Sequence, residues 1–107
     1  MKFKKLVLIS IVSLFPSIAF AGVGAGHAWG KITNITSITT GLLVHIGSGD
    51  VPQNCTSGNT WMHISEDNKT MISLTITAWT LGRDVVVYTS ASNSGYCPIT
   101  QVDPAES

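Results

Sequence analysis

The stretch EDNKTMISLTITAWTLG, residues 66–82, decides which fold the sequence predicts. Its interior alternates apolar and hydroxyl-bearing side chains, which is typical of a half-buried strand. Its boundaries indicate a helix instead, because Ser65 can act as an N-cap, acidic residues follow it, and Gly82 stands where a C′ glycine belongs. The stretch is also long for a single strand. We therefore expect a helix from Glu66 to Leu81, with a strand as the alternative.

At 100° per residue this helix carries two neighbouring apolar stripes, which together are wider than one small domain can cover. The first stripe consists of Met71, Leu74, Ala78 and Leu81, and the second of Ile72, Ile76 and Trp79. Two interpretations of the second stripe remain open. Either loops of the same chain cover it, or it packs against another subunit, and in that case these three residues form an oligomer interface.

Five segments around the helix have the composition or the period-2 alternation of strands. They are Trp29–Ile38, Leu42–Ile46 and the brief Trp61–Ile64 before the helix, and Val85–Thr89 and Pro98–Val102 after it. The residues Thr39-Thr40-Gly41 suit a tight hairpin between the first two strands. Gly22–Gly26 reads GVGAG, and with no strand before it we expect a flexible segment and no dinucleotide loop.

The resulting order of elements is β-β-β-α-β-β. A helix between the third and fourth strands of a five-stranded set is the connectivity of an OB-fold, a Greek-key barrel. We therefore expect a mainly β protein with one helix, folded as a single OB-fold-like domain over residues 22–107.

The first 21 residues have the organisation of a secretory signal peptide. A basic start with Lys2, Lys4 and Lys5 precedes an apolar run from Leu6 to Phe15 and the small-x-small exit Ala19-Phe20-Ala21. The alternative is a membrane anchor, but the run falls short of the roughly 20 apolar residues that a spanning helix needs. We expect cleavage near Ala21 and a secreted or periplasmic protein that does not span the membrane.

The charge balance changes once the signal peptide is removed. The 107-residue chain has 6 Lys and Arg against 6 Asp and Glu, and three of the basic residues lie in the first five positions. The mature chain therefore has a net charge of 3 − 6 = −3. An acidic domain is a poor partner for a phosphate backbone, so we do not expect it to bind nucleic acid.

Both cysteines, Cys55 and Cys97, lie in the mature chain. An even number of cysteines in an oxidising compartment indicates a disulfide, and two cysteines allow one pairing. The alternative, a cysteine metal site, lacks the CxxC spacing that such sites use. We expect a structural disulfide and neither a metal nor a cofactor.

Several segments together resemble the small exported B subunits of A-plus-five-B bacterial toxins, in the branch of subtilase cytotoxin and typhoid toxin. These segments are Gly30-Lys31-Ile32, Gly41–Ile46, Pro52–Cys55, Met71–Leu81, Gly82-Arg83-Asp84-Val85 and Gly95-Tyr96-Cys97. The resemblance implies an OB-fold, a homopentameric ring with its helices around a central pore, binding of sialylated glycans, and a toxin A subunit as partner.

Two groups of residues are candidates for glycan contacts. His45, Trp61 and His63 fall on the non-core faces of two strands, where OB-folds commonly bind oligosaccharides. A tryptophan ring offers a flat apolar surface, and imidazoles exchange hydrogen bonds with hydroxyl groups. The alternative is that Trp61 is a core or interface residue and that both histidines are ordinary surface residues.

The second group lies in one loop beside Cys97 and consists of Asn93, Ser94 and Tyr96. Its amide, hydroxyl and phenol groups suit carbohydrate recognition and equally suit an ordinary turn. No GxSxG, HExxH or P-loop motif is present, so we do not expect an enzyme. The sequence thus predicts an exported, non-enzymatic, oligomeric binding protein similar to a glycan-binding toxin B subunit. The alternative is a periplasmic inhibitor or immunity-type protein that binds another protein.

Overall fold

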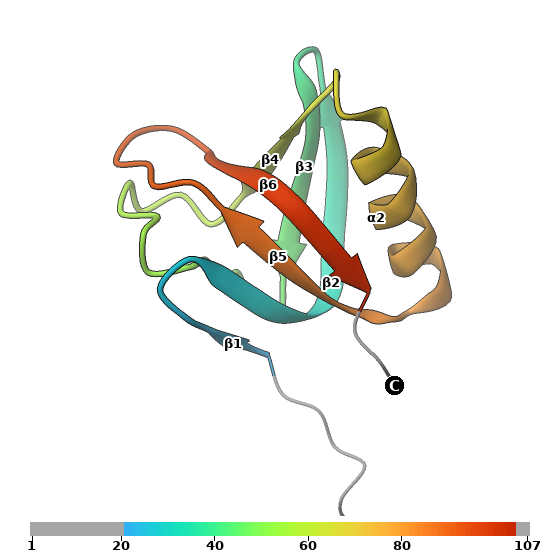
Figure 1. The fold of residues 1–107 in the computed structure, drawn as a ribbon, viewed down its shortest axis with the longest axis horizontal. Coiled ribbons are helices and arrows are strands. Elements are labelled where there is room, and N and C mark those ends of the chain that lie inside the picture. The colour runs from blue at the N-terminus through green and yellow to red at the C-terminus, as the bar shows by residue number, and fades with distance from the viewer. Residues whose placement is uncertain (1–20, 105–107) are drawn as a thin grey trace, which may run out of the picture.

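The computed structural model describes residues 21–104, so the expected signal peptide lies, except for Ala21, outside the described residues. The described chain is mainly β with one helix (Figure 1). Its elements are β1 (Gly22–Val23), β2 (His27–Ile38), β3 (Gly41–Ile46), β4 (Met62–Ser65), α2 (Lys69–Leu81), β5 (Asp84–Thr89) and β6 (Cys97–Pro104). The five expected strands and the helix are therefore present, in the expected order. Within the described residues no helix is both long and apolar enough to cross a membrane.

The strands form one six-stranded sheet in the order β1-β2-β3-β4-β6-β5, with an additional pairing between β2 and β5. All pairs are antiparallel except β4 with β6, which is parallel. The strand β2 has two partners, because residues 27–31 pair with β5 and most of the following residues pair with β3. The ladder therefore runs from β2 through β3, β4, β6 and β5 back to β2.

A bend in β2 lets its first part pair with β5 and its second part pair with β3. Gly30 has a φ of 142°, which favours glycine, and the register with β3 shifts between Ile32 and Asn34. A side chain at Gly30 would also press against Ala21. A glycine inside a strand pattern is a known sign of a bulge or of a close backbone approach.

The core lies between the inner faces of these strands and one side of α2, which packs against β6 and β2 (Figure 1). Alternate residues of β4, β5 and the first half of β2 are buried, as the period of a half-buried strand requires. The buried cluster consists of Ala28, Ile32, Leu42, Val44, Ile46, Met62, Ile64, Ala78, Val85, Val87, Cys97, Ile99 and Val102. The core therefore fixes which residues of each strand face outward.

The start of the helix differs from the sequence prediction. Ser65 was expected to cap it, but α2 begins at Lys69, and Asn68 precedes it without a side-chain capping bond. The carbonyl of Ser65 instead accepts a hydrogen bond from the N–H of Asn68, and the N–H of Glu66 donates to the carbonyl of Thr40 in the hairpin. Residues 65–68 therefore form a turn tied to the hairpin, which competes with the first helical turn.

The end of the helix confirms the prediction. Gly82 has a φ of 68°, its N–H donates to the carbonyl of Trp79, and the N–H of Arg83 donates to the carbonyl of Ala78. These two bonds form a Schellman motif, in which a left-handed residue after the last helical turn satisfies free carbonyls. Gly82 takes this conformation without the strain that a side chain would add.

The expected flexibility of Gly22–Gly26 is wrong for most of the segment. Gly22 and Val23 form β1 against Trp29 and Ala28, and the N–H of Gly24 donates to the carbonyl of His27 at 2.7 Å. The glycines allow this packing because side chains at Gly22 and Gly24 would overlap the rings of Trp29 and His27. The glycine-rich composition predicted a flexible segment, but in the structure the glycines let the rings of Trp29 and His27 lie close to the backbone.

Candidate functional site

The structure brings four of the predicted residues together on one outer surface, which we call the β3–β4 face: His45, Trp61, His63 and Tyr96. In the register of these strands Leu43 lies opposite His63, while Val44 and Met62 point into the core. The outward positions of β3 and β4 therefore include both histidines, as the alternation in the sequence predicts.

The closest ring contact on the β3–β4 face is between His45 and Trp61. The His45 and Trp61 rings stack with centroids 3.7 Å apart and planes at 22°, so each uses one flat side on the other. His45 Nε2 lies 3.0 Å from the Thr60 hydroxyl, and His63 Nε2 lies 3.0 Å from the Thr40 hydroxyl. The imidazoles thus already have hydrogen-bond partners within the chain.

Two further residues complete this face. Tyr96 is 41% exposed, and its ring centroid lies 6.3 Å from that of His63, with the planes nearly parallel. Leu43 is only 4% exposed although it lies outside the core cluster. An outward leucine that is nevertheless buried indicates a small apolar cluster on this face.

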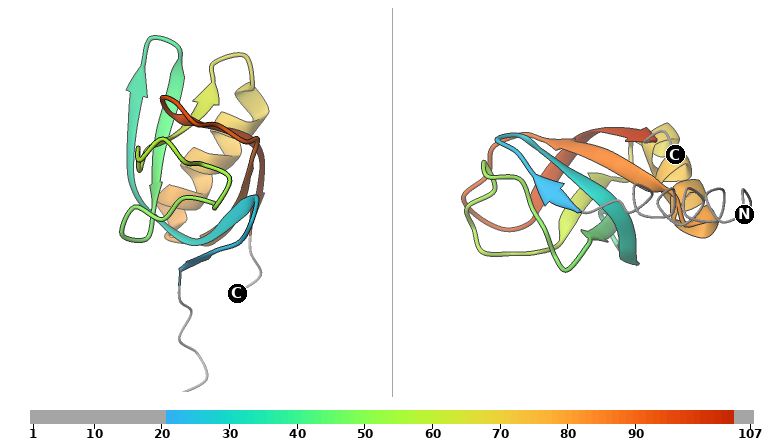
Figure 2. Two further views of the ribbon diagram at one scale, coloured as in Figure 1. Left: turned by 90° about the vertical axis from the view of Figure 1, so that its left-hand side faces the viewer. Right: turned by 90° about the horizontal axis from the view of Figure 1, so that it is seen from below.

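Asn93 and Ser94 lie in the loop before β6. This loop contacts the long loop before β4 (Figure 2). The predicted disulfide between Cys55 and Cys97 is present, with Cα atoms 5.7 Å apart. Backbone and side-chain bonds add to it: Thr56 N–H to Ser92 carbonyl, Ser92 N–H to Asn54 carbonyl, and Ser57 hydroxyl to Gly95 carbonyl. Both loops lie together at the end of the molecule away from α2 (Figure 1).

A polar pocket of about 390 Å³ lies between these two loops. It is lined by Asn54, Thr56, Ala91, Ser92 and Asn93. None of the four rings of the β3–β4 face lines it, so the structure does not bring Asn93 into the same site as Trp61. Ser94 is exposed in this loop, and its carbonyl accepts a hydrogen bond from the Ser92 hydroxyl.

Sequence reasoning missed a second aromatic surface, which we call the β2–β5 face. It consists of the outward residues of three paired strands in two rows: His27, Tyr88 and Gln101, and Trp29, Val86 and Asp103. Buried neighbours confirm that these positions point outward, since Ala28, Val87 and Val102 belong to the core. The signal was present in the sequence as the alternation His27, Trp29, Lys31.

The exposed ring of the β2–β5 face is its tryptophan, whereas the exposed ring of the β3–β4 face is Tyr96. Trp29 is 38% exposed, and its ring rests on the backbone of Gly22. The His27 ring lies between its neighbours, with centroids 5.4 Å from Trp29 and 5.8 Å from Tyr88. Beside the rings, Gln101 Nε2 donates to both carboxylate oxygens of Asp103, at 3.2 and 3.3 Å.

The outer side of α2 also exposes apolar residues. Ile76 is 42% and Trp79 45% exposed, whereas Ile72 is partly buried against the core. A groove of about 370 Å³ runs between this helix and the hairpin, lined by Ile35 and Leu42 as well as by Ile76 and Trp79. Within the described chain, loops do not cover Ile76 and Trp79, which was one of the two interpretations of the second stripe.

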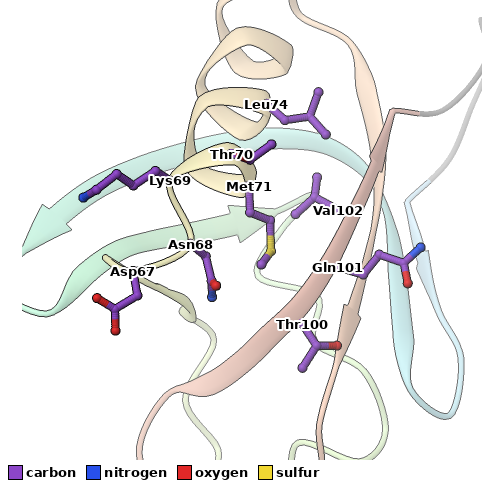
Figure 3. A pocket seen from close by; sticks show the side chains of 9 residues that line it. All are labelled: Asp67, Asn68, Lys69, Thr70, Met71, Leu74, Thr100, Gln101 and Val102. Carbon is purple, nitrogen blue, oxygen red and sulfur yellow. The ribbon is translucent and has the colours of Figure 1, made fainter.

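A further pocket, of about 420 Å³, lies at the start of α2 and contains none of the predicted site residues (Figure 3). Met71 and Val102 point toward each other across it, while Gln101 points away from the helix (Figure 3). Among residues 21–104 no group of three or more His, Cys, Asp or Glu side chains gathers as a metal site would require.

No family model, curated protein or solved structure matches the chain in comparisons with known proteins.

Proposed function

We propose that this chain is an exported, non-enzymatic binding protein that folds as an OB-fold barrel, assembles into an oligomer and recognises glycans. The observation that carries the proposal is the exposed Trp29, held flat on the β2–β5 face by Gly22 and His27. A rigid exposed indole provides an apolar surface for a sugar ring at little cost in conformational entropy.

The strand pairing supports the OB-fold part of the proposal. An OB-fold is a five-stranded Greek-key barrel, and here five strands pair in a ladder that returns to β2. The helix α2 lies between β4 and β5 in the chain, where the connectivity of the fold requires it. The strand β1 adds a sixth, two-residue strand outside this set.

Exposure favours Trp29 over Trp61 as the principal sugar contact. One side of the Trp61 ring is occupied by the His45 ring, at a centroid distance of 3.7 Å. The Nε2 atom of His45 already has a hydrogen-bond partner in the hydroxyl of Thr60. Trp29 is 38% exposed, and Asp103 lies in the same outward row two strands away. The β3–β4 face, together with Asn93 and Ser94, remains the second candidate surface.

A glycan array with the purified protein tests the function, and two matched variants locate the site. We expect Trp29→Ala to lose at least ten-fold in affinity for any glycan that the array identifies, while Trp61→Ala retains most of it. Circular dichroism of both variants establishes that they are folded. A blank array for the wild-type protein rejects glycan recognition, and loss only in Trp61→Ala moves the site to the β3–β4 face.

Oligomerisation is assigned to the outer side of α2. Ile76 and Trp79 expose apolar area beside a groove, and aromatic residues are enriched at interfaces between subunits. A ring of five copies is the assembly that the resemblance to toxin B subunits implies, with a toxin A subunit as its partner. Light scattering should give a mass of five subunits, and Trp79→Glu should reduce it to one.

The second candidate function is an inhibitor or immunity-type protein. The same exposed groove beside Trp79 favours it, because a monomer could use this surface to bind a different protein. A monomeric wild-type protein at micromolar concentration, together with a blank glycan array, would favour this second function over the first.

A further inference from the structure

The start of the expected mature chain is held more tightly than most chain ends. The strand β1 pairs with β2, and a side chain at Gly22 would overlap the Trp29 ring. The loop before β4 adds two backbone hydrogen bonds to residues 24 and 25, each 2.9 Å long. The first residues of a domain are poorly ordered unless they are tied down in this way. Cleavage after Ala21 would therefore place a new α-amino group at a fixed position.

Ala21, the residue before the expected cleavage point, packs against two glycines. A side chain at Gly30 would overlap the methyl group of Ala21, so Ala21 continues the pairing of β1 with β2 by one residue. A side chain at Gly47 would overlap both the Ala21 methyl group and Asp50 Oδ2. The methyl group and the carboxylate therefore lie beside the same glycine, and the peptide bond between Ala21 and Gly22 lies close to Asp50.

The carboxylate of Asp50 has no partner among residues 21–104. Its side chain is partly buried, and within this part of the chain neither a hydrogen bond nor an ion pair reaches it. The basic side chains of the mature chain lie elsewhere: Lys31 Nζ is 3.7 Å from Asp84 Oδ1, Lys69 starts α2, and Arg83 follows α2 and has an interaction of its own. A partly buried carboxylate gains most from a charged donor beside it.

We infer that cleavage after Ala21 completes the fold, because the new α-ammonium group of Gly22 binds the carboxylate of Asp50. A signal peptidase hydrolyses the bond between the Ala21 carbonyl carbon and the Gly22 nitrogen. The oxygen of one water adds to the carbonyl carbon, which leaves as a carboxylate, and both hydrogens of that water end on the nitrogen. The resulting group is an ammonium at neutral pH, with donors for a charge-assisted bond to Asp50.

The ion pair would distinguish the processed chain from its precursor. Before cleavage the nitrogen of Gly22 belongs to an uncharged peptide group, and Asp50 has no cation to bind. After cleavage the pair holds Gly22 in place, and with it the backbone on which the Trp29 ring rests. The β2–β5 face then takes its final form in the exported protein. The inference rests on the exported part of the proposed function and is independent of glycan recognition.

Thermal unfolding of four exported proteins tests the inference as a double-variant cycle. Each chain carries its own signal peptide, and mass spectrometry identifies its first residue. Inserting one alanine between Ala21 and Gly22 leaves an extra residue on the mature chain, which moves the ammonium group away from Gly22. We expect Asp50→Asn to lower Tm by about 3 °C in the wild-type background and by less than about 1 °C in the insertion background. Acetylation of the α-amino group creates the second background by an independent route.

Asp67→Asn is the matched control, because it removes the same charge from the exposed turn before α2 and should act equally in both backgrounds. Circular dichroism establishes that each variant is folded. Equal losses from Asp50→Asn in the two backgrounds, or no loss in either, overturn the inference and leave glycan recognition standing. A retained signal peptide overturns the inference together with export. A blank glycan array rejects glycan recognition alone.

Discussion

The β3–β4 face and the β2–β5 face carry similar residues and use them differently. Each has a tryptophan, a tyrosine and at least one histidine on the outside of the sheet. On the β3–β4 face His45 stacks closely on Trp61, and the imidazoles of His63 and His45 bond to Thr40 and Thr60. On the β2–β5 face Trp29 rests on a glycine and leaves more than a third of its surface in solvent.

This difference separates a cluster that contributes to the fold from the surface that we propose as the ligand-binding one. Stacked rings with satisfied polar atoms have little left to offer a sugar, because binding would have to replace contacts that already exist. An exposed ring fixed by close backbone contact loses little freedom on binding. The residue types alone do not distinguish the two faces, whereas their partners do.

The largest effect should come from the disulfide, which lies directly beside the β3–β4 face and reaches the β2–β5 face through the bonds of residues 53–55 to residues 24 and 25 and to Thr89. Cys97 pairs with Met62 at the start of β6, next to Tyr96, and Cys55 lies in the loop that leads to Trp61. For a separation of 42 residues, the double variant Cys55→Ala/Cys97→Ala should lower the free energy of unfolding by about 4 kcal/mol. Urea unfolding monitored by circular dichroism measures this loss.

The indole N–H signals in an NMR spectrum show which tryptophan changes its surroundings when the disulfide is removed. In the same double variant we expect the Trp61 signal to move or broaden more than the Trp29 signal, because the Cys55 loop leads directly to Trp61 and reaches Trp29 only through its bonds to Gly24 and Ala25. Equal changes at both tryptophans would show that the bridge organises the whole sheet, and the contrast between the two faces would then fail.

The sequence predicted the β3–β4 face because strand alternation places His45 and His63 outward, and no long-range information is needed for that step. It did not predict the β2–β5 face, since β2 changes partner at Gly30 and the pairing of Trp29 with Val86 joins residues far apart in the chain. Local patterns specify which residues point outward from one strand. They do not specify which outward residues from different strands become neighbours.

The two ends of the helix show the same difference between local patterns and contacts with distant residues. Its end was predictable because Gly82 acts through bonds to the preceding turn. Its start was not, because the N–H of Glu66 is taken by Thr40 from the hairpin, a contact that no local pattern contains. The missed strand β1 likewise depends on rings of Trp29 and His27 that approach glycines from outside the segment.

Glycine substitutions should give the next largest effect and sharpen the contrast between the faces. At Gly41 a Cβ atom would overlap the carbonyl oxygen of Ile64, at a φ of 155°. Because the Ile64 oxygen belongs to the backbone of the paired strand β4 and cannot move aside, Gly41→Ala should cost about 3 kcal/mol. Gly58→Ala is the control, with a φ of 88° but open space around it, and should cost about 1 kcal/mol.

The corresponding change on the other face is Gly22→Ala. Its Cβ atom would overlap side-chain atoms of the Trp29 ring, which would have to leave its present position against the backbone. We expect a loss of about 1 kcal/mol or less, accompanied by a shift in Trp29 fluorescence. A larger loss for Gly22→Ala than for Gly41→Ala would reverse the assignment of structural and ligand-binding roles.

The smallest effect should come from a single hydroxyl group on the β3–β4 face. Thr60→Val keeps the shape of the side chain but removes the partner of His45 Nε2, so stability should fall by about 1 kcal/mol. Thr100→Val is the matched change beside the β2–β5 face, where the hydroxyl bonds only to the backbone carbonyl of Tyr88 at 3.3 Å. It should cost about 0.5 kcal/mol, because that bond is longer than the 3.0 Å bond of Thr60. If Thr60→Val shifts the Trp61 indole signal and leaves glycan affinity intact, the His45–Trp61 stack is a structural element. If it weakens glycan binding instead, the stack belongs to the site.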